Sequence, residues 1–302
     1  MTDKHIPDPE EQELQEGDPR TTGHVWDGIK EFDNPMPRWW LWTFYLTIFW
    51  GIGYTIAYPA WPLINGATAG LLGYSTRAEV AEEIAEFDAM NDPIRARIEE
   101  VELAAITPDE NPDLYNFAVQ GGGAIFRTWC AQCHGSNAAG AVGYPNLLDD
   151  NWLWGGSLDE IYYTISHGIR NEDDPDARWS EMPAFGDILS DEEVSQVVQY
   201  VRNISGQEYE AELAAAGEEV YLNNCSACHM ENGTGERALG APNLTDAIWL
   251  YGGDEEALEY TVRNSRFGVM PPWSAEASSA GRLSEAELRS VSIYVHSRGG
   301  GE

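Results

Sequence analysis

The sequence predicts an all-α chain with one membrane-spanning helix near its N-terminus and two small helical domains in tandem behind it. Three observations predict this architecture: an apolar stretch of twenty residues at 39–58 without a charge, an internal duplication within residues 113–302, and helical spacing of apolar residues in both copies. Neither copy carries a convincing alternating strand pattern. With 302 residues, the chain is long enough for two domains and an anchor.

The chain is strongly acidic, with 17 Lys and Arg against 51 Asp and Glu and a net charge of −34. Only Lys4 and Lys30 are lysines. Such a surface repels nucleic acid, which excludes that class of partner. The acidity has two interpretations, a docking face for a basic partner or solvation of a surface in a salty medium, and the spread of the acids along the chain favours the second.

Residues 39–62 are predicted to form a transmembrane helix. No charged residue occurs from Trp39 to Thr76, and twenty residues at 1.5 Å each span a hydrocarbon core of about 30 Å. Tryptophan and tyrosine residues gather at both ends, as in interfacial aromatic belts. Because 38 polar residues precede the stretch, it does not resemble a cleaved signal peptide, and a buried core helix is the other alternative. The basic residues Lys30 and Arg38 place segment 1–38 in the cytoplasm.

Residues 63–112 are expected to form a helical spacer outside the membrane. Ser75 is a plausible N-cap for a polar helix, and Asn91-Asp92-Pro93 is predicted to break this helix before a second stretch that ends near Leu103. A segment rich in Pro, Asp and Asn, from Thr107 to Asp113, is interpreted as the boundary before the first globular domain.

The duplication divides the remainder into domains at 113–206 and 207–302. Five blocks recur in the same order, four of them at offsets of 94 to 97 residues and the Met-Pro block at an offset of 88, so a repeat is the only reasonable explanation. The blocks are Cys130–His134 with Cys225–His229, Pro145–Leu147 with Pro242–Leu244, Trp152–Gly156 with Trp249–Gly253, Met182-Pro183 with Met270-Pro271, and the helices that open at Leu189-Ser190 and Leu283-Ser284.

Each copy contains the motif C-x-x-C-H, which is typical of covalent haem attachment. Two thiols at this spacing can bind the two vinyl groups of a haem, and the adjacent histidine can then bind the iron. The motif therefore predicts two haem c groups, one on Cys130, Cys133 and His134 and one on Cys225, Cys228 and His229. A thioredoxin-like redox pair, a zinc site and a disulfide are alternatives, but none of them needs a histidine directly after the second cysteine.

Met182 and Met270 are the best candidates for the second axial ligands. Both precede a proline and recur at the same step of the repeat, whereas the other four methionines lie outside the copies or beside His229. A thioether ligand favours ferrous iron and raises the reduction potential. His167 is a rival ligand in the first copy, although a bond from His167 to a haem propionate or to a loop carbonyl is the better expectation. With both irons fully ligated, electron transfer is favoured over catalysis on this chain, and no catalytic residue is predicted.

From Thr21 onward, the chain resembles the dihaem subunit, CcoP or FixP, of cbb3-type cytochrome c oxidases. The most specific residues lie around the predicted membrane segment: Gly23–Ile29, Asp33–Trp40 and Tyr58–Pro62. The resemblance implies two tandem class I cytochrome c domains on the periplasmic side of a bacterial inner membrane. It also implies that His134 and Met182 bind the first iron, and that His229 and Met270 bind the second.

The same resemblance implies partners and a route for electrons. A cytochrome c or the bc1 complex would donate electrons to the two haems, which would pass them to a monohaem subunit and then to the haem–copper subunit that reduces O2 and pumps protons. The chain would then be the electron-transfer part of an oxidoreductase. A free membrane-anchored dihaem carrier fits the two domains equally well, and a dihaem peroxidase would need one iron with a displaceable ligand.

Overall fold

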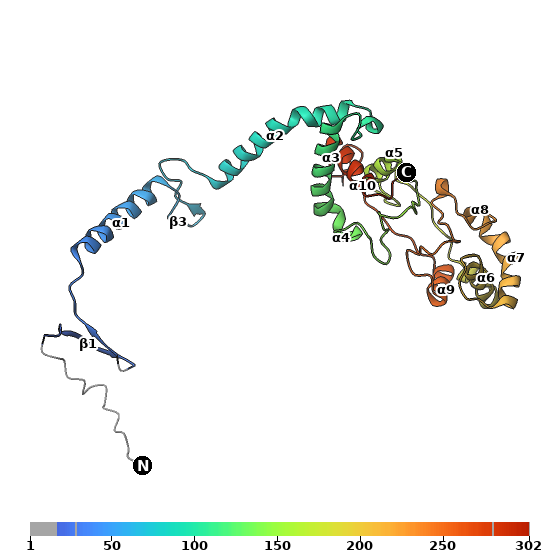
Figure 1. The fold of residues 1–302 in the computed structure, drawn as a ribbon, viewed down its shortest axis with the longest axis horizontal. Helices are drawn as coiled ribbons and strands as arrows, with labels where there is room; N and C mark the ends of the chain where they lie inside the picture. Colours follow the sequence, from blue (N-terminus) through green and yellow to red (C-terminus); the bar gives the residue numbers. More distant parts are fainter. Residues whose placement is uncertain (1–16, 28, 280, 302) are drawn as a thin grey trace, which may run out of the picture. The chain divides into compact units, whose positions relative to one another are not determined.

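The computed structural model describes residues 17–27, 29–279 and 281–301, and the chain divides into two compact units, one ending at Phe87 and one starting at Asp88. Figure 1 draws the ribbon along the chain. Lys4 and Gly28, on which parts of the sequence argument fall, lie outside the described residues.

Unit 1 contains two short antiparallel hairpins as well as a helix, so the prediction of an all-α chain is wrong for this part. Strands β1 (Thr21–Trp26) and β2 (Ile29–Phe32) pair with each other, as do β3 (Pro62–Leu63) and β4 (Gly66–Ala67). Strands this short escape a search for alternating patterns, which needs several residues of one periodicity.

Helix α1 (Arg38–Ala57) fills most of the apolar stretch and ends earlier than the predicted boundary at residue 62. Its end is fixed by the backbone, because Leu71 and Leu72 donate N–H bonds to the carbonyls of Ile56 and Ala57. In the described part of the chain, no helix is both long enough and apolar enough for a membrane crossing. The structure therefore does not confirm the predicted transmembrane helix.

Helix α2 (Thr76–Glu100) runs straight through Pro93, so the predicted break at Asn91-Asp92-Pro93 is wrong. A proline inside a helix removes one backbone hydrogen bond. Arg95 connects the turns on either side of Pro93, with its guanidinium 2.8 Å from the carboxylate of Asp88 and 3.4 Å from that of Asp92.

Unit 2 holds the two copies and is built from helices and loops. Its longer helices are α3 (Pro112–Ile125), α5 (Leu158–His167), α6 (Asp191–Ile204), α7 (Ala211–Asn224), α9 (Glu255–Asn264) and α10 (Glu285–His296). Its shorter turns are η2 (Leu103–Ala105), η3 (Phe126–Cys130), α4 (Ala131–His134), η4 (Phe185–Asp187), α8 (Ser226–His229) and η5 (Arg237–Leu239).

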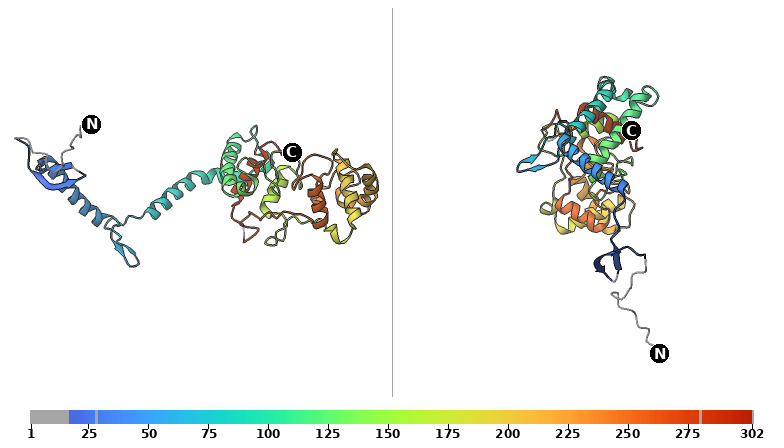
Figure 2. Two further views of the ribbon diagram at one scale, coloured as in Figure 1. Left: turned by 90° about the horizontal axis from the view of Figure 1, so that it is seen from below. Right: turned by 90° about the vertical axis from the view of Figure 1, so that its left-hand side faces the viewer.

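The two copies exchange their last helices. Helix α10 packs on α3 and α5 of the first copy, and α6 packs on α7 and α9 of the second (Figure 1). The left view of Figure 2 shows red α10 among the green helices, while the yellow and orange helices lie together at the other end. We call α3, α4, α5 and α10 the first module, and α6, α7, α8 and α9 the second module. Ranges 113–206 and 207–302 describe the repeat in the sequence, but each module draws on both ranges.

A short connection explains this exchange. Only residues 205–210 separate α6 from α7, and helices joined so closely fold back on each other as antiparallel neighbours. Since the copies are homologous, α10 then fits the equivalent place against α3. Where α3 crosses α10, Gly122 of α3 lies against the backbone of Ser290. Where α7 crosses α6, Gly217 of α7 lies against the backbone of Gln196.

Each module has its own buried core. In the first, Phe126, Ile161 and Ile165 pack against Leu288, Val291 and Val295 of α10. In the second, Tyr221 and Leu258 pack against the valines of α6. Capping boxes start α6 and α10, with Ser190 paired to Glu193 and Ser284 paired to Glu287.

Candidate haem sites

Both cysteine pairs lie at the end of the first helix of their copy. Cys130 and Cys225 are partly buried beside the module cores, whereas Cys133 and Cys228 are exposed. None of the four forms a disulfide. Each pair thus offers one sulfur toward the core and one at the surface, which places the edge of a covalently attached group at the surface.

The histidine of each motif is held by the carbonyl of a proline. Nδ1 of His134 lies 3.1 Å from the carbonyl oxygen of Pro145, and Nδ1 of His229 lies 3.0 Å from that of Pro242. Burial lowers the pKa of both imidazoles, and the hydrogen bond to the proline carbonyl opposes this only in part. Because a carbonyl can only accept, the neutral ring carries its proton on Nδ1 and leaves the lone pair of Nε2 free to bind a metal.

The proline carbonyls are functional groups that the sequence argument missed. The sequence shows the block Pro-Asn-Leu as part of the repeat but does not indicate a role for it. The block begins eleven residues after His134 and thirteen after His229, and this similar spacing is the signal in the sequence that could indicate a contact with the histidine.

The buried thiols do not resemble those of a redox pair. Burial raises the pKa of Cys130 and of Cys225 to about 11, with a smaller contribution from the neighbouring cysteine. Thioredoxin-like pairs have the opposite tendency, since their reactive thiol has a lowered pKa. In the described ranges, no group of three or more His, Cys, Asp and Glu side chains that could hold a metal ion includes any of the four cysteines, which disfavours a zinc site.

The two methionines lie in the opposite modules from those implied by the resemblance. Met270 packs against the first core, together with Cys130, Leu147 and Trp152. Met182 packs against the second core, together with Cys225, Leu244 and Trp249. The structure therefore brings Met270 to the motif of His134, and Met182 to the motif of His229.

Backbone contacts fix both methionines in these places. Ile169, just after α5, exchanges two hydrogen bonds of 2.9 and 3.0 Å with Met270, and a Cβ at Gly168 would overlap the Met270 carbonyl. In the second module, the hydroxyl of Ser265 donates a bond of 2.6 Å to the carbonyl of Met182. Ser265 follows α9 as Gly168 follows α5, so equivalent positions hold the methionine of the other copy.

Three family descriptions match the chain in sequence order. These are the N-terminal domain of cytochrome oxidase-cbb3, FixP, at residues 18–65; cytochrome c oxidase, cbb3-type, subunit III at residues 117–201; and cytochrome c at residues 214–299. The chain is also similar over most of its length to curated relatives. The cbb3-type cytochrome c oxidase subunit CcoP of Cereibacter sphaeroides is 59% identical over 288 residues, 95% of this chain and 97% of the relative. The CcoP subunit of Rhodobacter capsulatus is 51% identical (94% and 96%), and the FixP subunit of Sinorhizobium medicae is 47% identical (93% and 95%).

The chain belongs to the CcoP/FixP family of cbb3-type cytochrome c oxidase subunits. This confirms the resemblance and the two haem c groups predicted from the cysteine motifs. As a member of this family, the chain is a dihaem electron-transfer subunit of an oxidoreductase complex, which disfavours the free carrier and the peroxidase.

The residues of this CcoP/FixP chain fit haem c. Each module sets a partly buried thiol, an exposed thiol and a thioether around an apolar core. Each module also places beside this core an imidazole whose Nε2 is free to bind a metal. These are the donors that a covalently attached haem with histidine and methionine ligands requires.

His167 has a different partner from the one expected. Its Nδ1 lies 3.0 Å from the carboxylate of Asp174, and its ring lies against that of Tyr163. Asp174 is buried, and it also accepts a bond from the backbone of Asp176. His167 therefore fastens the loop after α5, the same loop whose Ile169 holds Met270.

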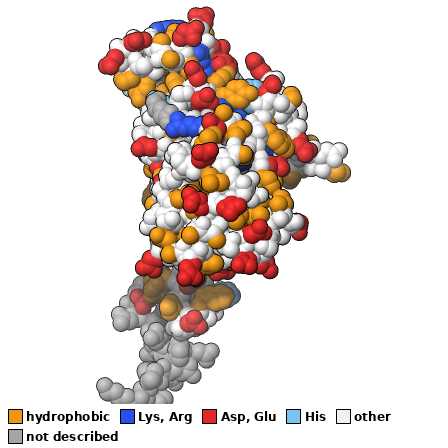
Figure 3. Space-filling view, turned by 90° about the vertical axis from the view of Figure 1, so that its right-hand side faces the viewer, with side chains coloured by type: hydrophobic (Ala, Val, Ile, Leu, Met, Phe, Trp, Pro, Cys, Tyr) orange, Lys and Arg blue, Asp and Glu red, His pale blue; other side chains and the backbone are white. Residues whose placement is uncertain are grey.

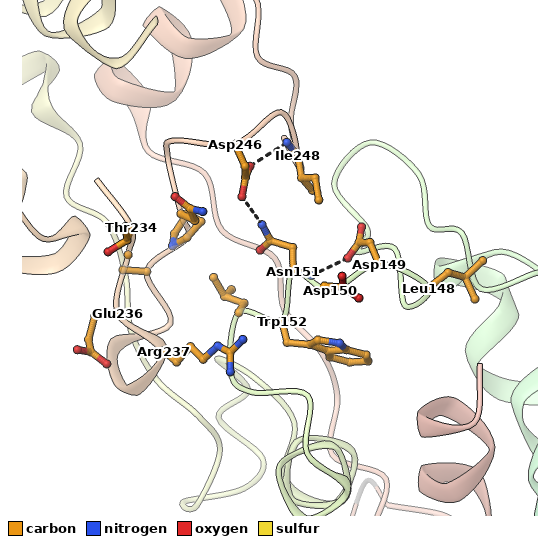
Figure 4. A pocket seen from close by; sticks show the side chains of 15 residues that line it. Leu148, Asp149, Asp150, Asn151, Trp152, Thr234, Glu236, Arg237, Asp246 and Ile248 are labelled. Atoms are coloured by element: carbon orange, nitrogen blue, oxygen red, sulfur yellow. Dashed lines mark hydrogen bonds between the residues drawn. The ribbon is translucent and has the colours of Figure 1, made fainter. Parts of the chain in front are cut away.

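A pocket of about 470 Å³ lies between the two copies but contains none of the predicted haem residues (Figure 4). Loop residues 148–153 line it from the first copy and residues 234–248 from the second. Asn151 donates a bond of 2.7 Å to Asp246 across the boundary. Pro242, whose carbonyl contacts His229, lines this pocket, and the pocket belongs to the contact between the copies.

Proposed function

We propose that this chain is a two-haem relay in which the copies exchange their methionine ligands. His134 and Met270 would bind one iron, and His229 and Met182 the other. The packing of each methionine beside the cysteine motif of the other copy carries this proposal. When bound, each haem supplies a one-electron carrier, and a thioether ligand raises its potential.

The chain's own residues would orient and protect these carriers. The carbonyls of Pro145 and Pro242 keep the proton on Nδ1 of each histidine, and Ile169 and Ser265 hold the methionine backbones in place. The apolar side chains around each site exclude water. We further propose that a cytochrome c or the bc1 complex donates the electrons, and that they leave through a monohaem subunit to the haem–copper subunit.

Purification of the complex from native membranes in mild detergent is expected to test this role. Haem b and cyanide-sensitive oxygen uptake should accompany haem c in the reduced-minus-oxidised spectrum. Cys130→Ala with Cys133→Ala should remove one of the two haem c groups and abolish uptake driven by cytochrome c, because the relay is then broken. Recovery of haem c alone through several mild detergents would contradict the proposal.

We also propose that α1 anchors the chain in a bacterial inner membrane, with its N-terminus in the cytoplasm and the modules in the periplasm. None of its side chains is buried in unit 1, and Leu46, Phe49 and Trp50 are each at least 69% exposed. Tryptophan and tyrosine lower its mean hydropathy, yet these residues favour the membrane interface. Exposed apolar side chains on all sides are stable only against lipid or protein.

A pair of single-cysteine variants is expected to reveal this orientation. In intact spheroplasts, Glu83→Cys should react with a membrane-impermeant maleimide, and Thr22→Cys should react only after permeabilisation. The four native cysteines do not interfere, because their sulfurs are bonded to haem. Equal labelling of both variants in intact spheroplasts would contradict the proposed topology.

A further inference from the structure

The surfaces around the two exposed cysteines, Cys133 and Cys228, differ in charge although the fold around them is the same. Phe126 and Tyr221 are both fully buried at equivalent positions, so residues 118–140 and 213–235 can be compared one to one. The first window contains Arg127 and no acid, a formal charge of +1. The second contains Glu218, Glu219 and Glu231 and no basic residue, a formal charge of −3.

All four of these charged side chains are exposed. The three glutamates replace Gly123, Ala124 and Ser136 of the first copy. General solvation in a salty medium would act on both copies alike, and it does not account for three acids in one window and none in the other. The difference therefore concerns what approaches each edge.

Two of the glutamates lie beside an apolar surface near Cys228, and the third, Glu231, follows that cysteine by three residues. Leu222 is 43% exposed, and Ala227 and Cys228 are exposed beside it on α8. Glu218 and Glu219 precede Leu222 by four and three residues, so they are its neighbours on the surface of α7. In the first copy, the position of Leu222 holds Arg127. We call Leu222, Ala227 and Cys228 the second haem edge, and Glu218, Glu219 and Glu231 its acidic rim.

Figure 3 shows the face of unit 2 on which the second module lies. Acidic side chains are scattered among hydrophobic ones over this face, and basic side chains are few. An apolar centre with a charged rim is the usual composition of a transient docking surface, in which the rim steers the partner and the centre makes the contact.

We propose that the second haem edge is the docking site for a basic electron-transfer protein that carries lysines around its own redox centre. This inference rests on the proposed relay function. The charge of the rim selects a cationic partner, and the exposed Cys228 marks where the covalently bound carrier comes closest to the surface. Electrons would then enter at the second module and leave from the first, whose edge would repel the same partner.

The test compares two variants of equal charge in the purified complex. Replacing Glu218, Glu219 and Glu231 with Gln removes the rim and keeps the side-chain size. Replacing Glu82, Glu83 and Glu86 of α2 with Gln removes the same charge from another exposed segment. The probe is reduced mitochondrial-type cytochrome c, which is rich in lysine, and its oxidation is followed by stopped flow between about 10 and about 150 mM salt.

At low salt, the rim variant is expected to lose about tenfold in the second-order rate constant and most of its salt dependence, while the α2 variant keeps both near the native values. Equal rates for the two variants would overturn the docking proposal. Each rate is divided by the oxygen uptake of the same preparation with a small neutral donor, which needs no docking. A native complex without uptake from the small donor would instead contradict the relay itself.

If the triple Gln variant does not assemble, Glu231→Ser alone provides the comparison, because the first copy already carries serine there. A smaller loss of rate at low salt that disappears at high salt supports the proposal. An unchanged rate overturns it.

Discussion

Replacing Met270 with histidine is expected to lower the reduction potential of the haem attached at Cys130 and Cys133. Met270 packs against the core of the first module and is bound there by Ile169. Exchange of a thioether for an imidazole removes the ligand that favours ferrous iron. Axial ligands set haem potentials over roughly 0.8 V, so we expect a decrease on the order of 0.2 V.

Potentiometric titration in single-haem backgrounds assigns the shift to one haem. With Cys225→Ala and Cys228→Ala only the first haem remains, and Met270→His should lower its potential. In the converse background, with alanine at 130 and 133, Met270→His should leave the second haem unchanged. Met182→His should show the reverse pattern. Met90→His, at an exposed position on α2, is the control for an added histidine.

A decrease confined to the second haem would contradict the exchanged arrangement and support the pairing within each copy. Loss of the methionine-to-iron charge-transfer band of the ferric protein offers an independent reading in the same samples. In this way the spectrum reports the ligand, and the titration reports its energetic effect.

The identity of the ligands could be predicted from the sequence, but their pairing could not. Cys, His and Met residues recur at the same steps of a duplicated chain, and this recurrence is visible without a structure. Because the copies are homologous, α10 fits α3 as well as α6 would, and any residue that suits one arrangement also suits the other. Which last helix packs on which copy depends on the short connection at 205–210. The repeat itself does not show how this connection affects the packing.

Contacts that the sequence does not reveal explain the other differences between the predictions and the structure. Pro93 and its polar neighbours have the composition of a helix break, yet Arg95 and Asp88 bridge the turn and the helix continues. The sequence predicts a haem propionate or a loop carbonyl as the partner of His167. It does not reveal that the loop after α5 brings Asp174 within hydrogen-bond distance of the His167 ring. The proline carbonyls were missed because a backbone atom leaves no chemical signature in the sequence.

The exchange of helices also predicts which helix loosens when a glycine at a crossing is replaced. In Gly217→Ala, the added Cβ would overlap the carbonyl of Gln196 in α6, and backbone cannot move aside as a side chain can. We expect the free energy of unfolding of the second module to fall by about 3 kcal/mol. Gly121→Ala is the matched control, since nothing lies within 4 Å of its Cβ and alanine favours the helix by about 0.5–1 kcal/mol.

Amide hydrogen exchange on the haem-loaded chain locates the effect. Gly217→Ala is expected to speed exchange in α6 and to leave α10 protected, and Gly122→Ala, whose Cβ would overlap the carbonyl of Ser290, should do the opposite. If each copy folded with its own last helix, Gly217 would face α10 and Gly122 would face α6. The same two variants would then loosen the other helix, so this measurement separates the two arrangements without reference to the haem ligands.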